Sequence, residues 1–428
     1  MTRLRGITGI ATCLIAGWTA PASADAVTEW NALALGCITR PGPTGLLDVA
    51  LVQAAVHDAV QAIEGKYEPY LATPAATGKE SVGAAAAAAA YTVLSDSRIC
   101  PDSAQPTLDT AFAPYLAGND AGLAVGYAAA EKLLSVYRPA GTLTFTGKNE
   151  IGQWRPTPPA NATMAFPWLK DVEPFAMTKP SQFRPGPPPT LDSRQYLREY
   201  NEAKEKGSIA NHPTTGACPA PVDTDLARFW AGNYVVQWNQ AARDIALDRQ
   251  LSLGDTARLL ALINLAAADA GIAIWDAKVY YNFWRPITAI QQGDADPNSR
   301  TVGDPNWHPF IENLSHFQPA GAAQNPAYPD YVSGANGLTG AFTATLQLFF
   351  GTDSVPFEIY KAPAAATVPI CTNPRTFRRI SDAADEVVEA RIFLGIHFRS
   401  ADVEARRLGT RIAFWTFFAK LRPIYQSH

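Results

Sequence analysis

The chain has little charge, few cysteines and few strand patterns for its length. Charged residues make up 17% of its 428 residues and hydrophobic residues 47%, so it can bury a large core and is not expected to be disordered. The 35 basic and 39 acidic residues give a net charge of −4. This balance argues against a nucleic-acid partner, because such proteins present a basic surface.

The N-terminus is interpreted as a secretory signal peptide over residues 1–24. Arg3 and Arg5 precede an apolar run, and the small residues Ala22-Ser23-Ala24 stand before the expected cleavage point. We therefore expect a periplasmic or secreted protein. The alternative, a buried N-terminal helix, would seldom end in such a cleavage pattern.

The five cysteines contain no CxxC pair, which disfavours a thiolate metal site. Cys13 would be removed with the signal peptide, so four cysteines would remain in an oxidising compartment. Our pairing hypothesis joins Cys37 to Cys100 and Cys218 to Cys371, because all four lie in polar stretches flanked by proline.

No later stretch is expected to span a membrane. The most apolar candidate, residues 259–275, is interrupted by Asp269 and flanked by Arg258 and Asp276, so it predicts a buried core helix. Strand patterns are scarce, whereas helical periodicity recurs and predicts an all-α protein. The expected helices are 46–63, 83–94, 121–136, 194–206, 225–247, 254–283, 337–350 and 380–398.

The 34 prolines predict long ordered loops, since proline is poorly tolerated inside helices. Residues 141–189 are dense in proline with aromatics interleaved, and we expect them to wrap the helices as an ordered segment. A second loop-rich insert is expected over residues 291–329.

The first candidate site element is a pair of cations. Lys278 and Arg285 are seven residues apart, which would place both on one face of a helix that Asp255 caps and Arg285-Pro286 ends. Taken alone, a solvated helix face is the simpler interpretation. Trp275 and Tyr328 could line an anion pocket here or merely close the core.

The second and third elements lie further along the chain. Ser333-Gly334 precede a helix, where they would offer a hydroxyl and backbone N–H groups to an anion, or form a plain N-cap. Arg391 and His397 would diverge on one helix and share a ligand only from its flanks or near the helix end. Gly395 would permit a close approach. By itself, His397 would be interpreted as a core residue.

Together, the three elements resemble the signature shared by vanadium-dependent haloperoxidases and type 2 phosphatidic acid phosphatases, which reads K-x6-RP, PSGH and SR-x5-H. The matching segments are Lys278-x6-Arg285-Pro286, Ser333-Gly334 with Val332 in place of proline, and Arg391-x5-His397 with Ala390 in place of serine. Sequence outside these motifs, including 57–63 and 153–159, resembles the bacterial haloperoxidase-like branch.

The resemblance implies two packed helical bundles, with residues 25–250 as the N-terminal half and 251–428 carrying the site. It implies that Lys278, Arg285 and Arg391 neutralise vanadate or phosphate, while Ser333 and Gly334 hydrogen-bond it. His397 would coordinate vanadium in a haloperoxidase or attack phosphorus in a phosphatase. The substrates would be hydrogen peroxide with a halide, or a phosphomonoester; the oligomeric state stays open.

The sequence departs from the signature at Ala335, which replaces a histidine that handles protons in the family. The loss of such a group typically reduces turnover by about two to four orders of magnitude, which favours bromide over chloride as the halide. His308 or His316 could substitute. Three hypotheses follow: a vanadate-dependent haloperoxidase-like enzyme, a periplasmic acid phosphatase with His397 as nucleophile, and a catalytically degenerate oxyanion-binding protein.

Overall fold

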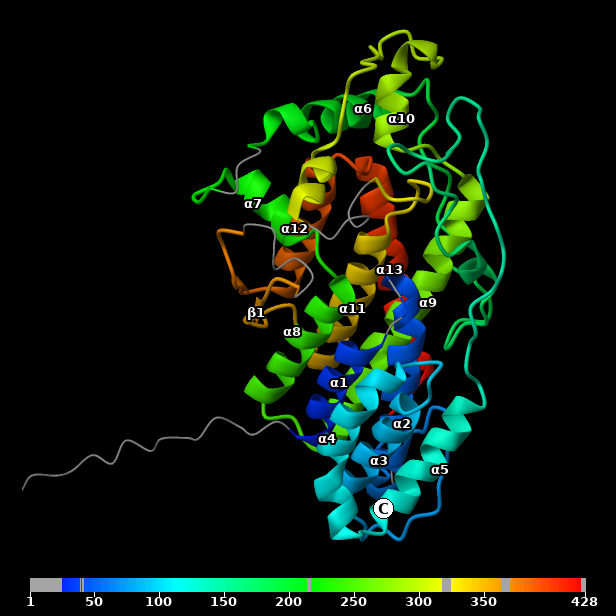
Figure 1. Ribbon diagram of the computed structural model, residues 1–428, viewed down its shortest axis with the longest axis vertical. Coiled ribbons are helices and arrows are strands. Elements are labelled where there is room, and N and C mark those ends of the chain that lie inside the picture. The colour runs from blue at the N-terminus through cyan, green and yellow to red at the C-terminus, as the bar shows by residue number, and fades with distance from the viewer. Residues whose placement is uncertain are drawn as a thin grey trace, which may run out of the picture.

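A computed structural model describes residues 25–424 apart from 39, 41, 214–216, 318–324 and 363–369. The expected signal peptide and Cys13 therefore lie outside the described residues. The described part is an elongated stack of helices (Figure 1), which confirms the all-α prediction. Its α-helices are α1 (Ala26–Cys37), α2 (Gly45–Glu64), α3 (Val82–Leu94), α4 (Gln105–Gly118), α5 (Gly122–Leu134), α6 (Arg194–Lys206), α7 (Val222–Phe229), α8 (Tyr234–Asp248), α9 (Leu253–Tyr281), α10 (Pro286–Gln291), α11 (Gly334–Phe350), α12 (Ile380–Phe393) and α13 (Arg399–Ala419).

Two short strands form the sheet that accompanies these helices in the described part of the chain. β1 (Phe357–Ile359) pairs antiparallel with β2 (Arg375–Phe377), and Phe357 lies opposite Phe377. The sheet packs beside α8 and α12, and its buried residues Phe357, Ile359 and Phe377 join the hydrophobic core.

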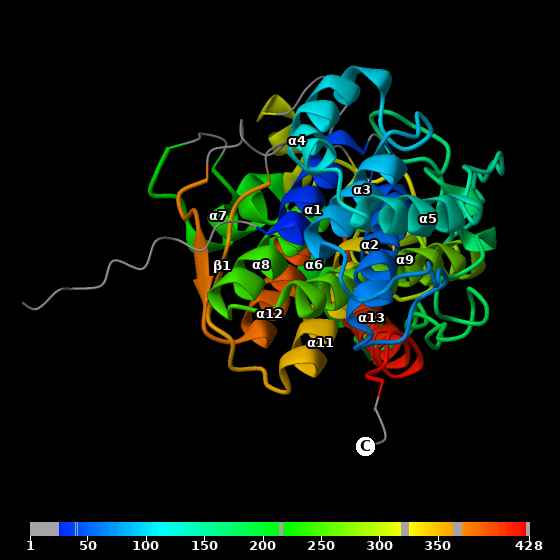
Figure 2. The same ribbon diagram turned by 90° about the horizontal axis from the view of Figure 1, so that it is seen from below.

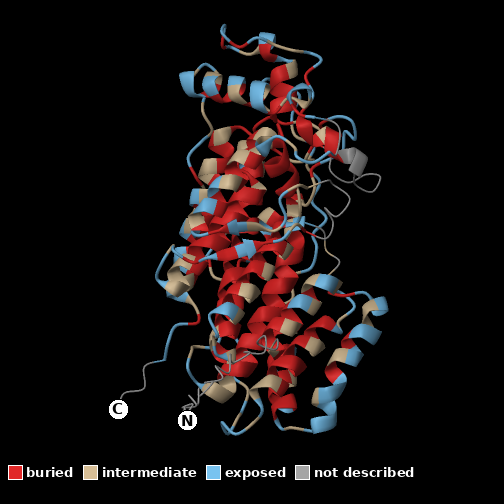
Figure 3. Cartoon of the chain, turned by 90° about the vertical axis from the view of Figure 1, so that its left-hand side faces the viewer, coloured by how far each residue is buried: buried red, intermediate tan, exposed pale blue. Residues whose placement is uncertain are grey.

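The core is built around α9, which contacts α2 on one side and α11 and α13 on the other. Viewed along the long axis, α2 and α9 lie in the middle of the molecule (Figure 2). Both are long and apolar enough to cross a bilayer, yet nearly all of their residues are buried inside the protein. Figure 3 shows buried residues as a continuous column through the bundle, and the prediction of a buried core helix over residues 259–275 is confirmed.

The ends of α9 differ from the expectation. Ser252 is the N-cap, since its hydroxyl accepts the backbone N–H of Asp255, so Asp255 is not itself the cap. The helix ends before Arg285, because Asn282 adopts the left-handed conformation at φ 47°. Pro286 instead begins α10, with Arg285 as its N-cap.

Other boundaries also needed correction. The expected helix 225–247 is two helices, because the Asn233 side chain accepts the N–H groups of Val235 and Val236 and starts α8 afresh. The expected helix 380–398 ends at Phe393, two residues before Gly395 at φ 72°. Helices α1, α4, α10 and α13 were not predicted.

The proline-rich segments are fixed to the helices by buried carboxylates. Asp269, in the middle of α9, accepts the backbone N–H groups of Phe175, Ala176 and Met177 at 2.6, 2.8 and 2.7 Å. Asp58 of α2 accepts three successive N–H groups of residues 70–72 in the same way. The wrap is therefore ordered, as predicted, because its backbone donors have strong acceptors inside the core.

Both predicted disulfides are present. Cys37 bonds to Cys100 and Cys218 to Cys371. Each closes a long stretch of chain, 63 and 153 residues respectively, and such cross-links restrict the unfolded chain.

Replacing Asp269 with alanine tests this fixation. We expect Asp269→Ala to lower the free energy of unfolding by about 3 kcal/mol or more, because three buried N–H groups lose their acceptor. The matched control is Asp248→Ala at an exposed position, for which we expect a change within about 0.5 kcal/mol. Urea denaturation followed by circular dichroism measures both, and equal midpoints for the two variants would contradict the assignment.

Candidate active site

Lys278 lies in the last turn of α9 and is completely buried. Its ammonium group donates to the carbonyl oxygens of Pro329 at 2.6 Å and Asp330 at 3.1 Å. The interpretation of a solvated helix face is therefore wrong, and main-chain carbonyls take the place of water around this charge.

Arg285 reaches the same place from outside the helix. Its Nε donates to the carbonyl of Tyr328 at 2.7 Å and its Nη1 to the carbonyl of Ile396 at 2.7 Å, and the side chain is completely buried. The chain turns at Asn282, so Arg285 and Lys278 do not share a helix face as the spacing predicted. They converge because both bind the segment that precedes α11.

Tyr328 covers this pair of cations. The Lys278 ammonium and the Arg285 guanidinium each lie 4.8 Å from the centre of its ring, within the range of a cation–π attraction. Trp275 packs against Tyr328 with ring centres 5.2 Å apart.

Ser333 and Gly334 begin α11, as the sequence predicted. Ser333 makes no side-chain capping bond, and its buried hydroxyl lies near the Asp402 carboxylate, whose pKa it lowers, without a hydrogen bond of normal geometry. A plain N-cap role is therefore excluded for this side chain. Its hydroxyl, the free N–H groups of the first turn and the positive end of the helix dipole are arranged to receive an anion.

Arg391 lies in the last turn of α12. Its Nη1 donates to the carbonyl of Trp230 at 3.3 Å and to the hydroxyl of Tyr234 at 3.2 Å, whereas its buried Nε has no partner. His397 follows the end of that helix, and the Arg391 guanidinium is close enough to lower the pKa of its imidazole.

Gly395 makes this turn possible. Its φ of 72° favours glycine, and an added Cβ would lie 2.4 Å from the carbonyl oxygen of Gly207 and 2.8 Å from Pro309. The expectation of a close approach is therefore confirmed.

The His397 ring is buried and bonded on one side. Its Nδ1 lies 2.6 Å from Oδ1 of Asp330, so one proton is shared between the two groups. With that proton on Nδ1, the Nε2 lone pair is available to an electron-poor atom. Burial lowers the pKa of His397 well below its usual range, and the positive charges of Arg285, Lys278 and Arg391 lower it further, so the imidazole is neutral.

Two buried carboxylates were missed by the sequence analysis. Asp330 shares a proton with His397, and Asp402, in the first turn of α13, accepts a hydrogen bond from Asn336 at 2.7 Å. Each retains one oxygen without a partner. Asp330 lies three residues before Ser333, and Asp402 lies five residues after His397. Neither was selected from the sequence, because acidic side chains are not expected beside a bound anion.

Charges within the site shift one another's protonation. Burial lowers the pKa of the Lys278 ammonium, and the nearby Arg285 guanidinium lowers it further. Burial raises the pKa of Asp402 to about 7 and that of Asp330 well above its usual range. Because the cations and the two carboxyl groups lie close together, binding an anion favours protonation of Asp330 and Asp402.

The proposed substitutes for the missing histidine do not lie in this cluster. His308 is half exposed and bonds Glu312 at 2.8 Å, and the side chain of His316 lies outside the described residues. Ala335 points its methyl group into a cavity of about 620 Å³ that also reaches Gly334 and Arg391.

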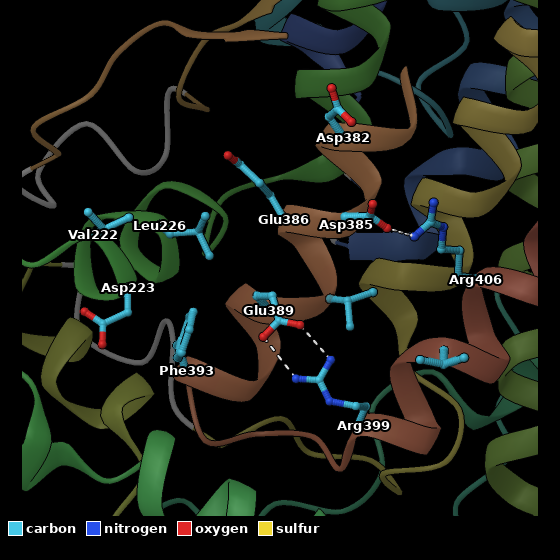
Figure 4. Close-up of a pocket in the computed structure, with 12 residues that line it drawn as sticks. Val222, Asp223, Leu226, Asp382, Asp385, Glu386, Glu389, Phe393, Arg399 and Arg406 are labelled. Atoms are coloured by element: carbon cyan, nitrogen blue, oxygen red, sulfur yellow. Dashed lines mark hydrogen bonds and ion pairs between the residues drawn. The ribbon is translucent and has the colours of Figure 1, made fainter. Parts of the chain in front are cut away.

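Another cavity, of about 690 Å³, lies between α7, α12 and α13 (Figure 4). Acidic side chains surround it, and three of them are paired: Glu389 with Arg399, Asp385 with Arg406, and Glu386 with Arg375. None of the six predicted site residues lines it.

The cluster fits an oxyanion better than any alternative occupant. The buried Ser333 hydroxyl and the unpartnered Arg391 Nε supply donors, and three basic side chains offset a multiple negative charge. Within the described residues no group of three or more His, Cys, Asp or Glu side chains could hold a metal cation. The chemistry of the donors therefore favours a tetrahedral oxyanion.

Comparisons with known proteins agree with this geometry. Residues 258–423 match the family described as the VCPO second helical-bundle domain. The chain is 26% identical over 292 residues to the vanadium chloroperoxidase of Curvularia inaequalis, a match that covers 55% of this chain and 46% of that enzyme. The chain thus spans about half the length of this relative.

Two solved structures share the fold. The first bacterial vanadium-dependent iodoperoxidase superposes with a TM-score of 0.71 at 22% identity, covering 93% of this chain and 96% of that one. A holo bacterial vanadium-dependent chloroperoxidase gives a TM-score of 0.67 at 15% identity, covering 89% and 92%.

The charge balance of the site predicts a pH dependence of anion binding. Sulfate is a suitable probe because its charge is constant near neutrality. Above a pH of about 7 the ionised Asp402 repels the anion, so we expect sulfate affinity to fall about tenfold between roughly pH 6 and 8. Isothermal titration calorimetry measures this fall.

The matched variants are Asp402→Asn, which should remove most of the pH dependence, and Asp385→Asn, whose carboxylate pairs with Arg406 at the surface and which should keep it. An Asp402→Asn protein with an unchanged pH profile would overturn the explanation.

Proposed function

The chain is similar to vanadium haloperoxidases, and from that premise we propose that it is an exported, vanadate-dependent haloperoxidase-like enzyme that uses hydrogen peroxide to oxidise bromide rather than chloride. The observation that carries the proposal is the position of two buried cations and the partly buried Arg391 around one buried hydroxyl and one neutral histidine. Such a cluster is costly unless an anion occupies it.

Each residue has a defined part in this proposal. Lys278, Arg285 and Arg391 would neutralise the negative charge of vanadate, Ser333 and the Gly334 N–H would hydrogen-bond its oxygens, and His397 would bind the vanadium through Nε2. Asp330 fixes the His397 ring through the 2.6 Å contact at Nδ1. Bound vanadate would supply the Lewis acidity that activates peroxide toward halide.

Proton transfer requires a group other than the missing histidine. Ala335 can neither donate nor accept a proton. Asp402 lies in the charged cluster, is held by Asn336 and titrates at a pKa of about 7, which suits a general acid near neutral pH. In this proposal Asp402 supplies the proton, and the resulting turnover is lower than with a histidine at 335.

The other two hypotheses remain as alternatives. The same cradle would serve an acid phosphatase, with His397 as nucleophile and phosphate as part of the substrate. The same residues would also serve a protein that binds an oxyanion without turnover, an alternative that Ala335 favours.

The two disulfides support export of the protein. We also propose that the chain is divided into an N-terminal half, residues 25–250, and a C-terminal half, residues 251–428.

Activity assays separate the three alternatives. The purified chain is incubated with vanadate and assayed for bromination with bromide, peroxide and an organic acceptor, and the vanadate-free chain is assayed with an aryl phosphate. We expect bromination, and we expect Arg391→Ala to reduce it about 10²- to 10³-fold because a charge partner of the anion is lost. Arg406→Ala, which breaks a surface ion pair, is the control.

The outcomes are distinct. Phosphate release without vanadate indicates the phosphatase, and absence of both activities with retained stabilisation by phosphate indicates the degenerate protein.

Restoring the histidine tests the proton-transfer argument. We expect Ala335→His to raise kcat for bromide oxidation by at least about tenfold, because it returns a group that titrates near neutral pH. Oxygen release from bromide and peroxide measures this without an organic acceptor. An unchanged kcat, with Asp402→Asn also unchanged, would mean that neither position handles the proton.

A further inference from the structure

The cavity beside the anion site is larger than its small substrates need. Its volume is about 620 Å³, and it meets the site at Gly334, Ala335 and Arg391. Peroxide and halide contain only one or two heavy atoms. Cavities of roughly 300–1,000 Å³ are typical of sites for organic ligands.

The walls of this cavity suit a neutral ring. Arg391 is the one charged residue among those that line it. Tyr328 separates the cavity from Lys278 and Arg285, since its ring covers both cations and also lines the cavity. The remaining surface combines aromatic rings with small residues, the main ones being Tyr234, Trp275, Tyr328, Ala160, Ala231 and Ala327.

Hydrogen bonds and ring contacts fix the aromatic side chains that line this cavity. The Trp275 indole N–H donates to the carbonyl of Ala165 at 2.8 Å, and its ring packs on Tyr328. The Tyr234 hydroxyl accepts from Arg391 at 3.2 Å. Fixed aromatic faces bind planar ligands with little loss of side-chain entropy.

A polar group is also available in the wall. Asn325 donates through Nδ2 to the Glu312 carboxylate at 2.6 Å and to the carbonyl of Pro158 at 3.1 Å, whereas its buried Oδ1 has no hydrogen-bond partner. This acceptor would satisfy a ring hydroxyl. A cavity with apolar walls and a single free acceptor favours a phenol over a charged compound.

Ala335 lies where the cavity and the anion site join. A larger side chain at this position would fill part of the junction. The residue that weakens proton transfer therefore also opens the route by which a bulky substrate reaches the oxidising centre.

We propose that this cavity binds a neutral, electron-rich aromatic acceptor of the phenol class, so that halogen is transferred inside the protein. The inference rests on the proposed function. The overall reaction is ArH + Br⁻ + H₂O₂ + H⁺ → ArBr + 2 H₂O. A ring C–H bond is replaced by C–Br, bromide supplies the halogen, and peroxide is reduced to two waters.

Direct binding is the first test. The vanadate-free chain, saturated with sulfate, is titrated with 2-naphthol in a calorimeter, and we expect saturable binding. Ala231→Phe fills the cavity from the turn between α7 and α8 and should weaken binding at least about tenfold through steric exclusion. The control is Ala113→Phe at an exposed position of α4, and sulfate affinity should be equal in all three proteins.

Product analysis is the second test. We expect vanadate-loaded protein to brominate 2-naphthol with an isomer ratio that differs from that of free hypobromite, and Ala231→Phe to return the ratio to that of the free reagent. Oxygen release from peroxide and bromide, which needs no acceptor, should stay within about twofold in Ala231→Phe, because Ala231 lies outside the anion cradle.

The two proposals fail in different ways. If 2-naphthol binds and Ala231→Phe prevents this, the cavity assignment stands even where bromination is absent. Absence of saturable binding, equal binding by Ala231→Phe, or an isomer ratio identical to that of free hypobromite would overturn it.

Discussion

The structure depends on burying two positive charges, and partly burying a third at Arg391, without a direct ion pair to any of the three among the described residues. Lys278 and Arg285 are held by main-chain carbonyl oxygens of the segment before α11 and of the His397 turn. Carbonyl dipoles reduce the cost of removing these cations from water without cancelling their charge. The site therefore keeps a positive potential that a tetrahedral anion can neutralise. The two carboxylates, Asp330 and Asp402, limit this potential and make it sensitive to protons.

The sequence was sufficient to predict the all-α class, both disulfides and the ordered wrap, and it selected the six residues that we propose to form the anion site. Local patterns carry that information: helical periodicity, proline density and motif spacing. The geometry that joins the motifs was not predictable in the same way. Lys278 and Arg285 meet because the chain reverses at Asn282, and left-handed asparagine is a weak signal in sequence.

Asp330 and Asp402 could not be predicted for a different reason. Their function follows from which neighbour each one faces, His397 for Asp330 and Asn336 for Asp402. These contacts join α11, α13 and the intervening turns, and such long-range contacts leave no periodic trace. The break between α7 and α8 was also not predictable from periodicity. It arises because the side chain of Asn233 accepts backbone N–H groups and starts a new helix.

The two parts of the site are built from different kinds of structure. The anion cradle is formed at the ends of packed helices, by Lys278, Ser333 and Arg391, whereas much of the cavity wall comes from loops such as 160–162 and 325–328. Asp269 fixes the wrap to the same helix that presents Lys278. Loop residues can therefore change during evolution while the cradle keeps its shape, so related proteins could diverge in organic substrate and share one oxidising centre.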